Sequence, residues 1–209
     1  MTRFEKLIEH FREFPGIGPR QARRFVYFLL GRSKTNITEL SQLILDVKAE
    51  MKVCGNCFRF FPSENRNANI CPICSDKNRR VDIMMIVSRD VDLENIEKSQ
   101  TFNGLYFVLG GTLPILEKEP EKRIRIKELL SRITTDSEKS GTEKLQEIIL
   151  GMSANPEGEN TARYISEQLK PMASQKNIKI SGLGRGLSTG TELEYSDPET
   201  LKSALENRG

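Results

Sequence analysis

The amino-acid sequence predicts a composite α+β and α/β fold built from four consecutive parts. Helical periodicity runs through the first 52 residues, all four cysteines fall between positions 54 and 74, and strand-like runs alternate with helical ones from position 81 onward. The predicted parts are a helix-hairpin-helix region, a small four-cysteine finger, a mainly parallel α/β domain, and a C-terminal segment of strand, loop and helix, at residues 1–52, 53–80, 81–177 and 178–209.

Length and composition are those of a globular chain in an aqueous compartment. The 209 residues are 37% hydrophobic and 29% charged, which is enough apolar matter for a core and too much for a disordered chain. The longest apolar run, Phe25 to Leu30, is far shorter than the ~18 residues of a membrane-spanning helix. The N-terminus is charged from its third residue and has no apolar signal-peptide region, so we expect a cytoplasmic protein without a membrane partner.

Charge is distributed unevenly along the chain. Residues 1–80 carry 15 Lys and Arg against 8 Asp and Glu, a net charge of +7, whereas residues 81–209 carry 17 against 21, a net charge of −4. A basic N-terminal part joined to a mildly acidic remainder suggests an anionic partner for the first part. A solvated helix face would tolerate the same charge, so this observation needs support from specific motifs.

Three amphipathic helices account for the first 52 residues. The first two carry apolar stripes at helical spacing, formed by Phe4, Leu7, Ile8 and Phe11, and then by Ala22, Phe25, Val26, Leu29 and Leu30. We expect the third helix to open at Asn36, where Glu39 three residues later completes a capping-box pattern. Its predicted apolar positions are Ile37, Leu40, Ile44, Val47 and Met51.

The four cysteines form the most specific pattern in the sequence. Cys54 and Cys57 make one CxxC pair and Cys71 and Cys74 make the second, so four thiolates can reach the corners of a tetrahedron. Two disulfides are the alternative in an oxidising compartment, and a redox CxxC pair would not need a second copy nearby. We therefore predict one Zn²⁺ per chain. Because four cysteines complete the tetrahedron, the metal is expected to be structural.

A turn between the first two helices carries the second pattern. Two glycines, Gly16 and Gly18, lie between two prolines in the sequence PGIGP, and Arg20, Arg23 and Arg24 follow. Glycines allow close approach of a phosphate to the backbone, and the start of the next helix offers free N–H groups. This arrangement favours a helix-hairpin-helix that binds DNA without reading its sequence. An ordinary helix–helix corner with exposed arginines is the alternative.

Alternation of strands and helices follows the cysteines. The expected strands cover Val81–Val87, Leu105–Leu109, Glu147–Met152 and Ile178–Ser181. Helical periodicity separates them at positions 126–133 and 161–169, and a further helix starts at Asp197 and Pro198. We expect a polar surface loop at Thr134–Thr142. This order predicts βαβ units with parallel strands.

Acidic residues follow two of the expected strands. Glu157 and Glu159, in the sequence NPEGE, come after the strand at 147–152, where α/β folds place ligand sites. A magnesium site is one interpretation, and acidic residues that favour a helix N-terminus are the other. Asp90 and Asp92, after the first strand, allow the same two interpretations. The sequence GLGRG at 182–186 lacks the GK[ST] of a phosphate loop, so we do not predict nucleotide binding there.

The order of these motifs resembles a known family. The PGIGP turn, the four cysteines, FVLGG at Phe107–Gly111, NPEGE and the tail RGLSTGTELEYSDPETLKSALENR together are similar to the RecR family of bacterial recombination mediators, over nearly the whole chain. The resemblance implies a helix-hairpin-helix, a zinc finger, a Toprim domain and a C-terminal segment. It also implies a tetrameric ring around DNA in the bacterial nucleoid. The family acts with RecO or RecF to load RecA recombinase onto gapped DNA coated by single-strand-binding protein.

The resemblance also assigns roles to residues of this chain. It implies that Cys54, Cys57, Cys71 and Cys74 ligate zinc, that Arg20 and Arg24 contact DNA, and that Glu157 and Glu159 contact a partner protein or bind Mg²⁺. Catalytic Toprim enzymes have a glutamate at the end of the first strand, where this chain has Ser88. We therefore expect a DNA-binding adaptor that is not an enzyme, the alternative being a Mg²⁺-dependent Toprim enzyme that transfers phosphodiesters.

Overall fold

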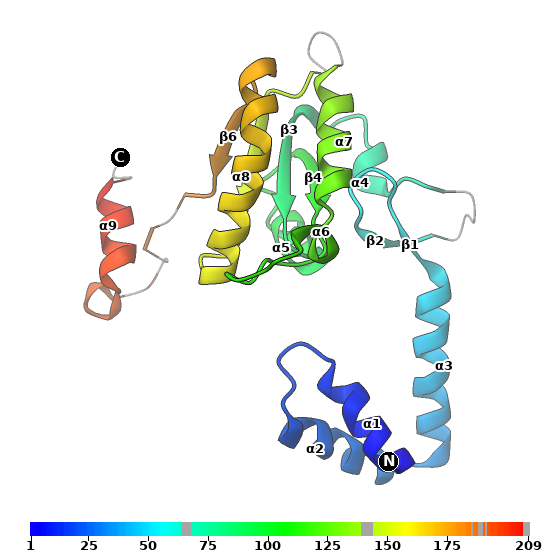
Figure 1. Ribbon diagram of the computed structural model, residues 1–209. Coiled ribbons are helices and arrows are strands. Elements are labelled where there is room, and N and C mark those ends of the chain that lie inside the picture. The colour runs from blue at the N-terminus through cyan, green and yellow to red at the C-terminus, as the bar shows by residue number, and fades with distance from the viewer. Residues whose placement is uncertain (64–67, 139–143, 185, 188–189, 191, 207–209) are drawn as a thin grey trace. The chain divides into compact units, whose positions relative to one another are not determined.

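The chain forms two compact units (Figure 1). The computed structural model describes residues 1–63, 68–138, 144–184, 186, 187, 190 and 192–206. The N-terminal unit comprises Met1–Met51 and also Pro62 and Ser63, and the second unit comprises Lys52–Phe61 and the described residues from Ala68 onward. Among the described residues, no helix combines the length and apolar character needed to span a membrane.

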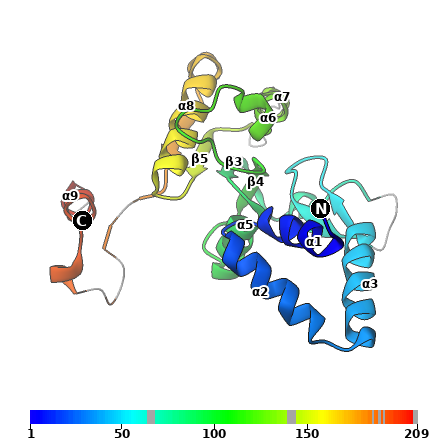
Figure 2. The same cartoon turned by 60° about the horizontal axis from the view of Figure 1, so that its bottom comes forward.

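Helices α1 (Arg3–Arg12) and α2 (Pro19–Leu30) pack as the two arms of a hairpin (Figure 2). A capping box starts α1, because the Thr2 hydroxyl accepts from the Glu5 N–H and the Glu5 carboxylate accepts from the Thr2 N–H. The core between the arms consists of Ile8, Ala22 and Val26. These three residues belong to the predicted apolar stripes of α1 and α2, which are confirmed in part. The other residues of the two stripes are only partly buried.

Helix α3 (Lys34–Glu50) begins earlier than the sequence predicts. Its N-cap is Ser33, whose hydroxyl accepts a hydrogen bond from the Asn36 N–H at 3.2 Å. The predicted start at Asn36 is therefore wrong, because a cap three residues upstream already satisfies the N–H of that residue. None of the residues of α3 is buried.

A four-stranded parallel sheet forms the centre of the second unit. Its strands are β3 (Arg80–Val87), β4 (Gly104–Val108), β5 (Glu147–Gly151) and β6 (Lys179–Gly182), in the spatial order β4-β3-β5-β6. In the register, Met84 pairs with Leu105 on one side and with Ile148 on the other. All four predicted strands are confirmed within about one residue of their expected ends.

Alternating side chains of the sheet enter two different cores. Met84 and Ile86 share a core with residues of the helices α7 (Ile126–Ser137) and α8 (Pro156–Lys176). Figure 1 shows both helices beside the sheet. Met85 and Val87 face helix α5 (Asp90–Ser99) and the cysteine segment (residues 51–80). The cysteine segment therefore replaces a helix as part of the cover of one sheet face.

Several shorter elements complete the fold. The cysteine segment contains β1 (Met51–Val53), which pairs with β2 (Phe60–Pro62), and the short helix α4 (Pro72–Ser75). Helix α6 (Pro120–Arg123) precedes α7, and the tail has a 3₁₀ turn at Leu193–Tyr195 and helix α9 (Pro198–Glu206).

Two expectations about chain connections have different outcomes. The predicted helix start at Asp197 is confirmed, because its carboxylate accepts from the Thr200 N–H at 2.9 Å. The predicted loop at Thr134–Thr142 is wrong in its first part, because α7 continues to Ser137 with Asp136 and Ser137 buried. Residues 139–143 of that predicted loop lie outside the described residues.

Candidate metal centre and candidate nucleic-acid interface

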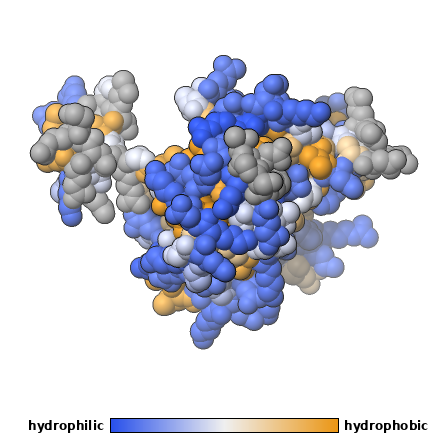
Figure 3. Space-filling model, turned by 90° about the horizontal axis from the view of Figure 1, so that it is seen from above, coloured by the Kyte–Doolittle hydropathy of each residue, from blue (hydrophilic) through white to orange (hydrophobic). Residues whose placement is uncertain are grey.

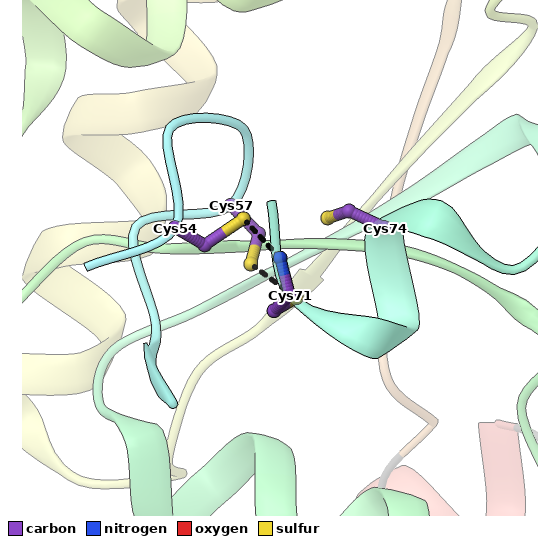
Figure 4. A group of neighbouring side chains, drawn as sticks. All are labelled: Cys54, Cys57, Cys71 and Cys74. Carbon is purple, nitrogen blue, oxygen red and sulfur yellow. Dashed lines mark hydrogen bonds between the residues drawn. The ribbon is translucent and has the colours of Figure 1, made fainter. Parts of the chain in front are cut away.

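The four cysteines converge from two places in the chain (Figure 4). Cys54 and Cys57 belong to a tight turn after β1, whereas Cys71 and Cys74 lie at the beginning and within the single turn of α4. Cys71 is the N-cap of that helix, and Pro72 occupies its first turn, where a missing N–H costs nothing. The local sequence CPxC therefore directs both thiols of the second pair toward the first pair.

Distances among the sulfur atoms fit a tetrahedral metal site. All four Sγ atoms lie within 4.8 Å of one another, and the Sγ atoms of Cys57 and Cys71 are 3.6 Å apart. A tetrahedron with Zn–S bonds of about 2.3 Å has edges of about 3.8 Å. Three of the cysteines are fully buried and Cys74 is partly exposed. Within the described part of the chain, this is the one group of three or more side chains suited to hold a metal ion.

The four thiols are so close together that the protonation state of each one depends on the others. Hydrogen bonds from Cys57, Cys71 and Cys74 lower the pKa of Cys54 far below its usual range. Hydrogen bonding to Cys54 raises the pKa of Cys57 and of Cys74. A divalent cation at the centre removes this conflict, because it stabilises all four thiolates together.

The cysteine segment is bonded to the sheet as well as to itself. The Val108 N–H of β4 donates to the Cys57 carbonyl at 2.8 Å, so the segment covers part of the edge of β4. The Phe58 ring packs against Phe107, with ring centroids 5.3 Å apart. Arg125 donates to the carbonyls of Val108 and Phe58, at 2.9 and 3.4 Å. Sequence analysis missed Arg125, whose position just before α7 carries no recognisable signal.

The hairpin turn has the geometry that the PGIGP sequence predicts. Gly16 has φ of +76°, a conformation that L-residues with a side chain rarely adopt. Gly18 is the N-cap of α2 with an extended backbone, and Pro19 is the first helical residue. A Cβ atom added at either glycine would meet no other atom within 4 Å. The turn is therefore open to a ligand on the side of both glycines.

Three arginines lie beside this turn on exposed positions of α2. Arg20, Arg23 and Arg24 are exposed, whereas Ala22 and Val26 of the same helix are buried. Arg24 donates to the Gln21 side chain at 3.4 Å, and within the described residues no carboxylate pairs with any of the three. Guanidinium groups without a carboxylate partner, placed next to free N–H groups at a helix start, form a surface suited to phosphates.

At the edge of the sheet where the parallel strands end, the residue after β3 carries a hydroxyl group. Catalytic Toprim enzymes have a glutamate at this position. Ser88 follows β3 directly, is 3% exposed, and donates to the Met152 thioether at 3.1 Å. The two aspartates after this strand have structural roles. Asp90 accepts from the Phe60 N–H at 2.7 Å, and Asp92 accepts from the Arg89 N–H at 2.9 Å.

The acidic turn at the start of α8 is organised around its N-cap. Asn155 accepts from the Gly158 N–H at 2.8 Å, and Glu157 and Glu159 lie in the first helical turn. Gly158 is required by space, because a Cβ there would come within 2.1 Å of the Ser153 carbonyl oxygen. The Thr112 hydroxyl donates to the Glu157 carboxylate at 2.8 Å. Sequence analysis named the two glutamates as candidate site residues and missed Thr112.

Sequence comparisons agree with this architecture. Three family models match the chain: "RecR, helix-hairpin-helix" over residues 4–48, "Toprim domain" over residues 82–183 and "RecR, C-terminal" over residues 186–208. The recombination protein RecR of Chloroflexus aggregans is 37% identical over 97% of this chain and 91% of its own length. The chain belongs to the RecR family. The RecR proteins of Clostridium perfringens and Staphylococcus aureus are 35% and 36% identical, over 98% and 97% of this chain and 94% of their own lengths.

Family membership confirms the predicted fold class. The RecR helix-hairpin-helix match covers α1, α2 and most of α3, and the Toprim match covers the parallel sheet with α5, α7 and α8. The four cysteines lie between these two matches. The roles expected for the hairpin arginines, the cysteines and the two Toprim glutamates stay predictions.

Proposed function

We propose that this RecR family protein is a DNA-binding clamp and adaptor in recombinational repair. In this proposal it acts with RecO or RecF to help load RecA onto gapped DNA coated by single-strand-binding protein. The observation that carries the DNA part is the coincidence of three exposed arginines with the open glycine turn at the start of α2. Contacts of this kind recognise the phosphate backbone and carry no base information.

Assembly into a ring is supported by the apolar surface of the N-terminal unit. Its exposed large hydrophobic residues outnumber its buried ones and belong to α1, α2, α3 and the hairpin turn. Besides Met1 at the start of the chain, they are Leu7, Phe14, Phe25, Tyr27, Phe28, Leu30, Leu40, Leu43, Ile44, Leu45 and Val47. An apolar surface of this extent is typical of a protein interface. We propose that copies of this unit contact one another in a homotetramer.

We propose a structural Zn²⁺, one per chain, for the four-cysteine site. The support is the donor set, since thiolates at these distances match the preferences of zinc. Four protein ligands leave no position for a substrate, so the ion would hold the segment against β4 and take no part in a reaction.

Salt dependence tests the DNA interface. We expect Arg20→Ala/Arg24→Ala to weaken binding by a similar factor on two unrelated DNA sequences and to flatten the log–log salt slope. Each lost phosphate contact removes ~0.9 from the slope on duplex DNA and ~0.7 on single strands. The matched control is Lys6→Ala/Arg12→Ala, which removes the same charge from exposed positions of α1. An unchanged slope in the folded Arg20/Arg24 variant would mean that the hairpin is only a helix corner.

A second experiment separates the adaptor from a Toprim enzyme. Metal-assisted phosphodiester chemistry needs carboxylates that hold the ion. The residue at the end of β3 is Ser88, which has a buried hydroxyl group instead of a carboxylate. We therefore expect the purified protein with Mg²⁺ to produce no nicking, relaxation or ligation of plasmid DNA. Glu157→Ala should lower the affinity for RecO or RecF. Mg²⁺-dependent nicking that disappears in Glu157→Ala would replace the adaptor by the enzyme.

A further inference from the structure

Exposed aromatic side chains lie among the arginines of helix α2. A row at four-residue spacing along one side of the helix and just past its end consists of Arg20, Arg24, Phe28 and Arg32. Tyr27 lies beside this row, and Tyr27 and Phe28 are each 58% exposed. We call these five residues the α2 row. On the face that Figure 3 displays, by contrast, apolar residues form small separate patches on a mostly hydrophilic surface.

Both rings of the α2 row are held by their neighbours. The Arg32 guanidinium lies over the Phe28 ring, 4.3 Å from its centroid. The Tyr27 ring packs against Phe4 of α1, with ring centroids 5.4 Å apart, and α1 packs along α2 (Figure 2). Because the rings are already restrained, they lose little conformational freedom when a flat partner covers them.

The charge around the two rings fits an anionic partner. Residues 14–38 contain five basic side chains and neither Asp nor Glu. The carboxylates on and next to α1 have neighbours of their own, because Glu5 caps the helix, and Glu9 and Glu13 lie 2.8 and 3.9 Å from an arginine and a histidine of that helix. Among the described residues, no carboxylate pairs with an arginine of the α2 row. A polyanion would therefore meet uncompensated positive charge here.

Helix α3 exposes a different kind of apolar surface. Its exposed large apolar side chains are aliphatic, and the helix carries two Lys residues together with three acidic ones. Mixed charges allow two copies of such a face to pair, whereas two copies of the α2 row would bring arginines together. The α2 row is therefore better matched to a nucleic acid, which leaves the aliphatic residues of α3 for contacts between copies.

We propose that Tyr27 and Phe28 stack against unpaired bases of single-stranded DNA while the arginines of the same row contact its phosphates. Surfaces that bind single strands combine a basic track with aromatic rings, because every base has a flat π face. In duplex DNA the bases are paired and stacked on one another, so the rings cannot reach these faces. The inference rests on the proposed DNA-binding function and adds that the hairpin unit binds the single-stranded part of gapped DNA.

Three DNA probes test the stacking with the full-length protein: an oligothymidylate, an abasic strand of the same length, and a blunt duplex of that length. Tyr27→Leu/Phe28→Leu removes both rings and keeps apolar, helix-forming side chains. We expect it to bind the oligothymidylate about tenfold or more weakly than the wild type, with unchanged affinity for the other two probes. The salt slope should stay the same, because the phosphate contacts remain.

Further variants separate stacking from folding. Tyr27→Phe/Phe28→Tyr keeps a ring at each position and should bind all three probes like the wild type. Phe28→Leu alone leaves the contact of Tyr27 with Phe4 in place and should show part of the loss, so the test does not depend on the folding of the double variant. The matched control is Phe60→Leu, which removes a 42% exposed ring from the second unit.

The possible outcomes distinguish this inference from the proposed function. Wild-type affinity for the oligothymidylate in the folded leucine variants would overturn the stacking while leaving phosphate binding by the arginines intact. An equal loss on all three probes would also overturn it, because the rings would then only support the helix. So would a reduced native mass, because the rings would then lie between copies of this chain. If the wild-type protein bound none of the probes, the DNA-binding function itself would fail, and the stacking with it.

Discussion

The two units of this chain bury their apolar residues to very different extents. The sheet unit has two continuous cores, one on each face of β3, and the fully buried side chains Phe107 and Tyr106 belong to different ones. The N-terminal unit buries only Ile8, Ala22 and Val26, and α3 buries none of its residues. A unit that leaves most of its apolar side chains exposed depends on other molecules for their burial. The comparison agrees with the homotetramer that we propose, in which contacts between copies would cover the N-terminal unit.

The cysteine segment is the part of the sheet unit that we expect to depend on a bound metal ion. Its buried apolar contribution is small, and four of the side chains at its centre are thiols. Its cover of β4 requires the hydrogen bond at the Cys57 carbonyl and the packing of Phe58, both next to the cluster. The metal that we propose would therefore stabilise one edge of the sheet as well as the segment itself.

Removal of the metal is expected to have the largest effect. Structural zinc in small domains contributes about 10 kcal/mol or more to folding, so Cys71→Ser or a strong chelator should unfold the segment and sharply lower the thermal stability of the whole sheet unit. Metal analysis should give one zinc per wild-type chain and far less in the variant. Lys77→Ala, at an exposed position after α4, serves as the control. Well under one equivalent of metal in the wild type, together with intact disulfides, would contradict the prediction.

A charge on the exposed face of α3 should change assembly without changing the fold. Ile44 is 62% exposed, so Ile44→Asp disturbs little packing within the unit and places a carboxylate in the proposed interface. We expect the native mass in solution to fall while the circular dichroism spectrum stays the same. Lys48→Asp, on the same helix, is the control for added negative charge. An unchanged mass for Ile44→Asp would show that this face of α3 does not lie in an interface between copies.

Sequence patterns predicted those features that depend on local spacing. Strands that are apolar at nearly every position, such as Val81–Val87 with its one exception Asp82, can be recognised from the local sequence, and so can the CxxC pairs. Helix α5 was not predicted, since Leu93 is its only buried residue and its apolar stripe is weak. Contacts such as those of Thr112 and Arg125 join residues 45 and 67 positions apart, and no local pattern records them.

Substitutions at the two glycines of the hairpin turn separate an effect on folding of the N-terminal unit from an effect on DNA binding. Gly16 has φ of +76°, so Gly16→Ala should cost about 1–2 kcal/mol of stability, as expected for an L-residue forced into the left-handed region. Gly18 has an extended backbone with open space around it, so Gly18→Ala should leave the free energy of unfolding nearly unchanged. If phosphates approach the backbone at the start of α2, the added methyl group of Gly18→Ala should still weaken DNA binding by several-fold. Denaturant titrations and DNA-binding isotherms of the two variants give both quantities. If Gly18→Ala bound DNA with wild-type affinity, the phosphates would contact the arginine side chains alone and not the N-terminus of α2.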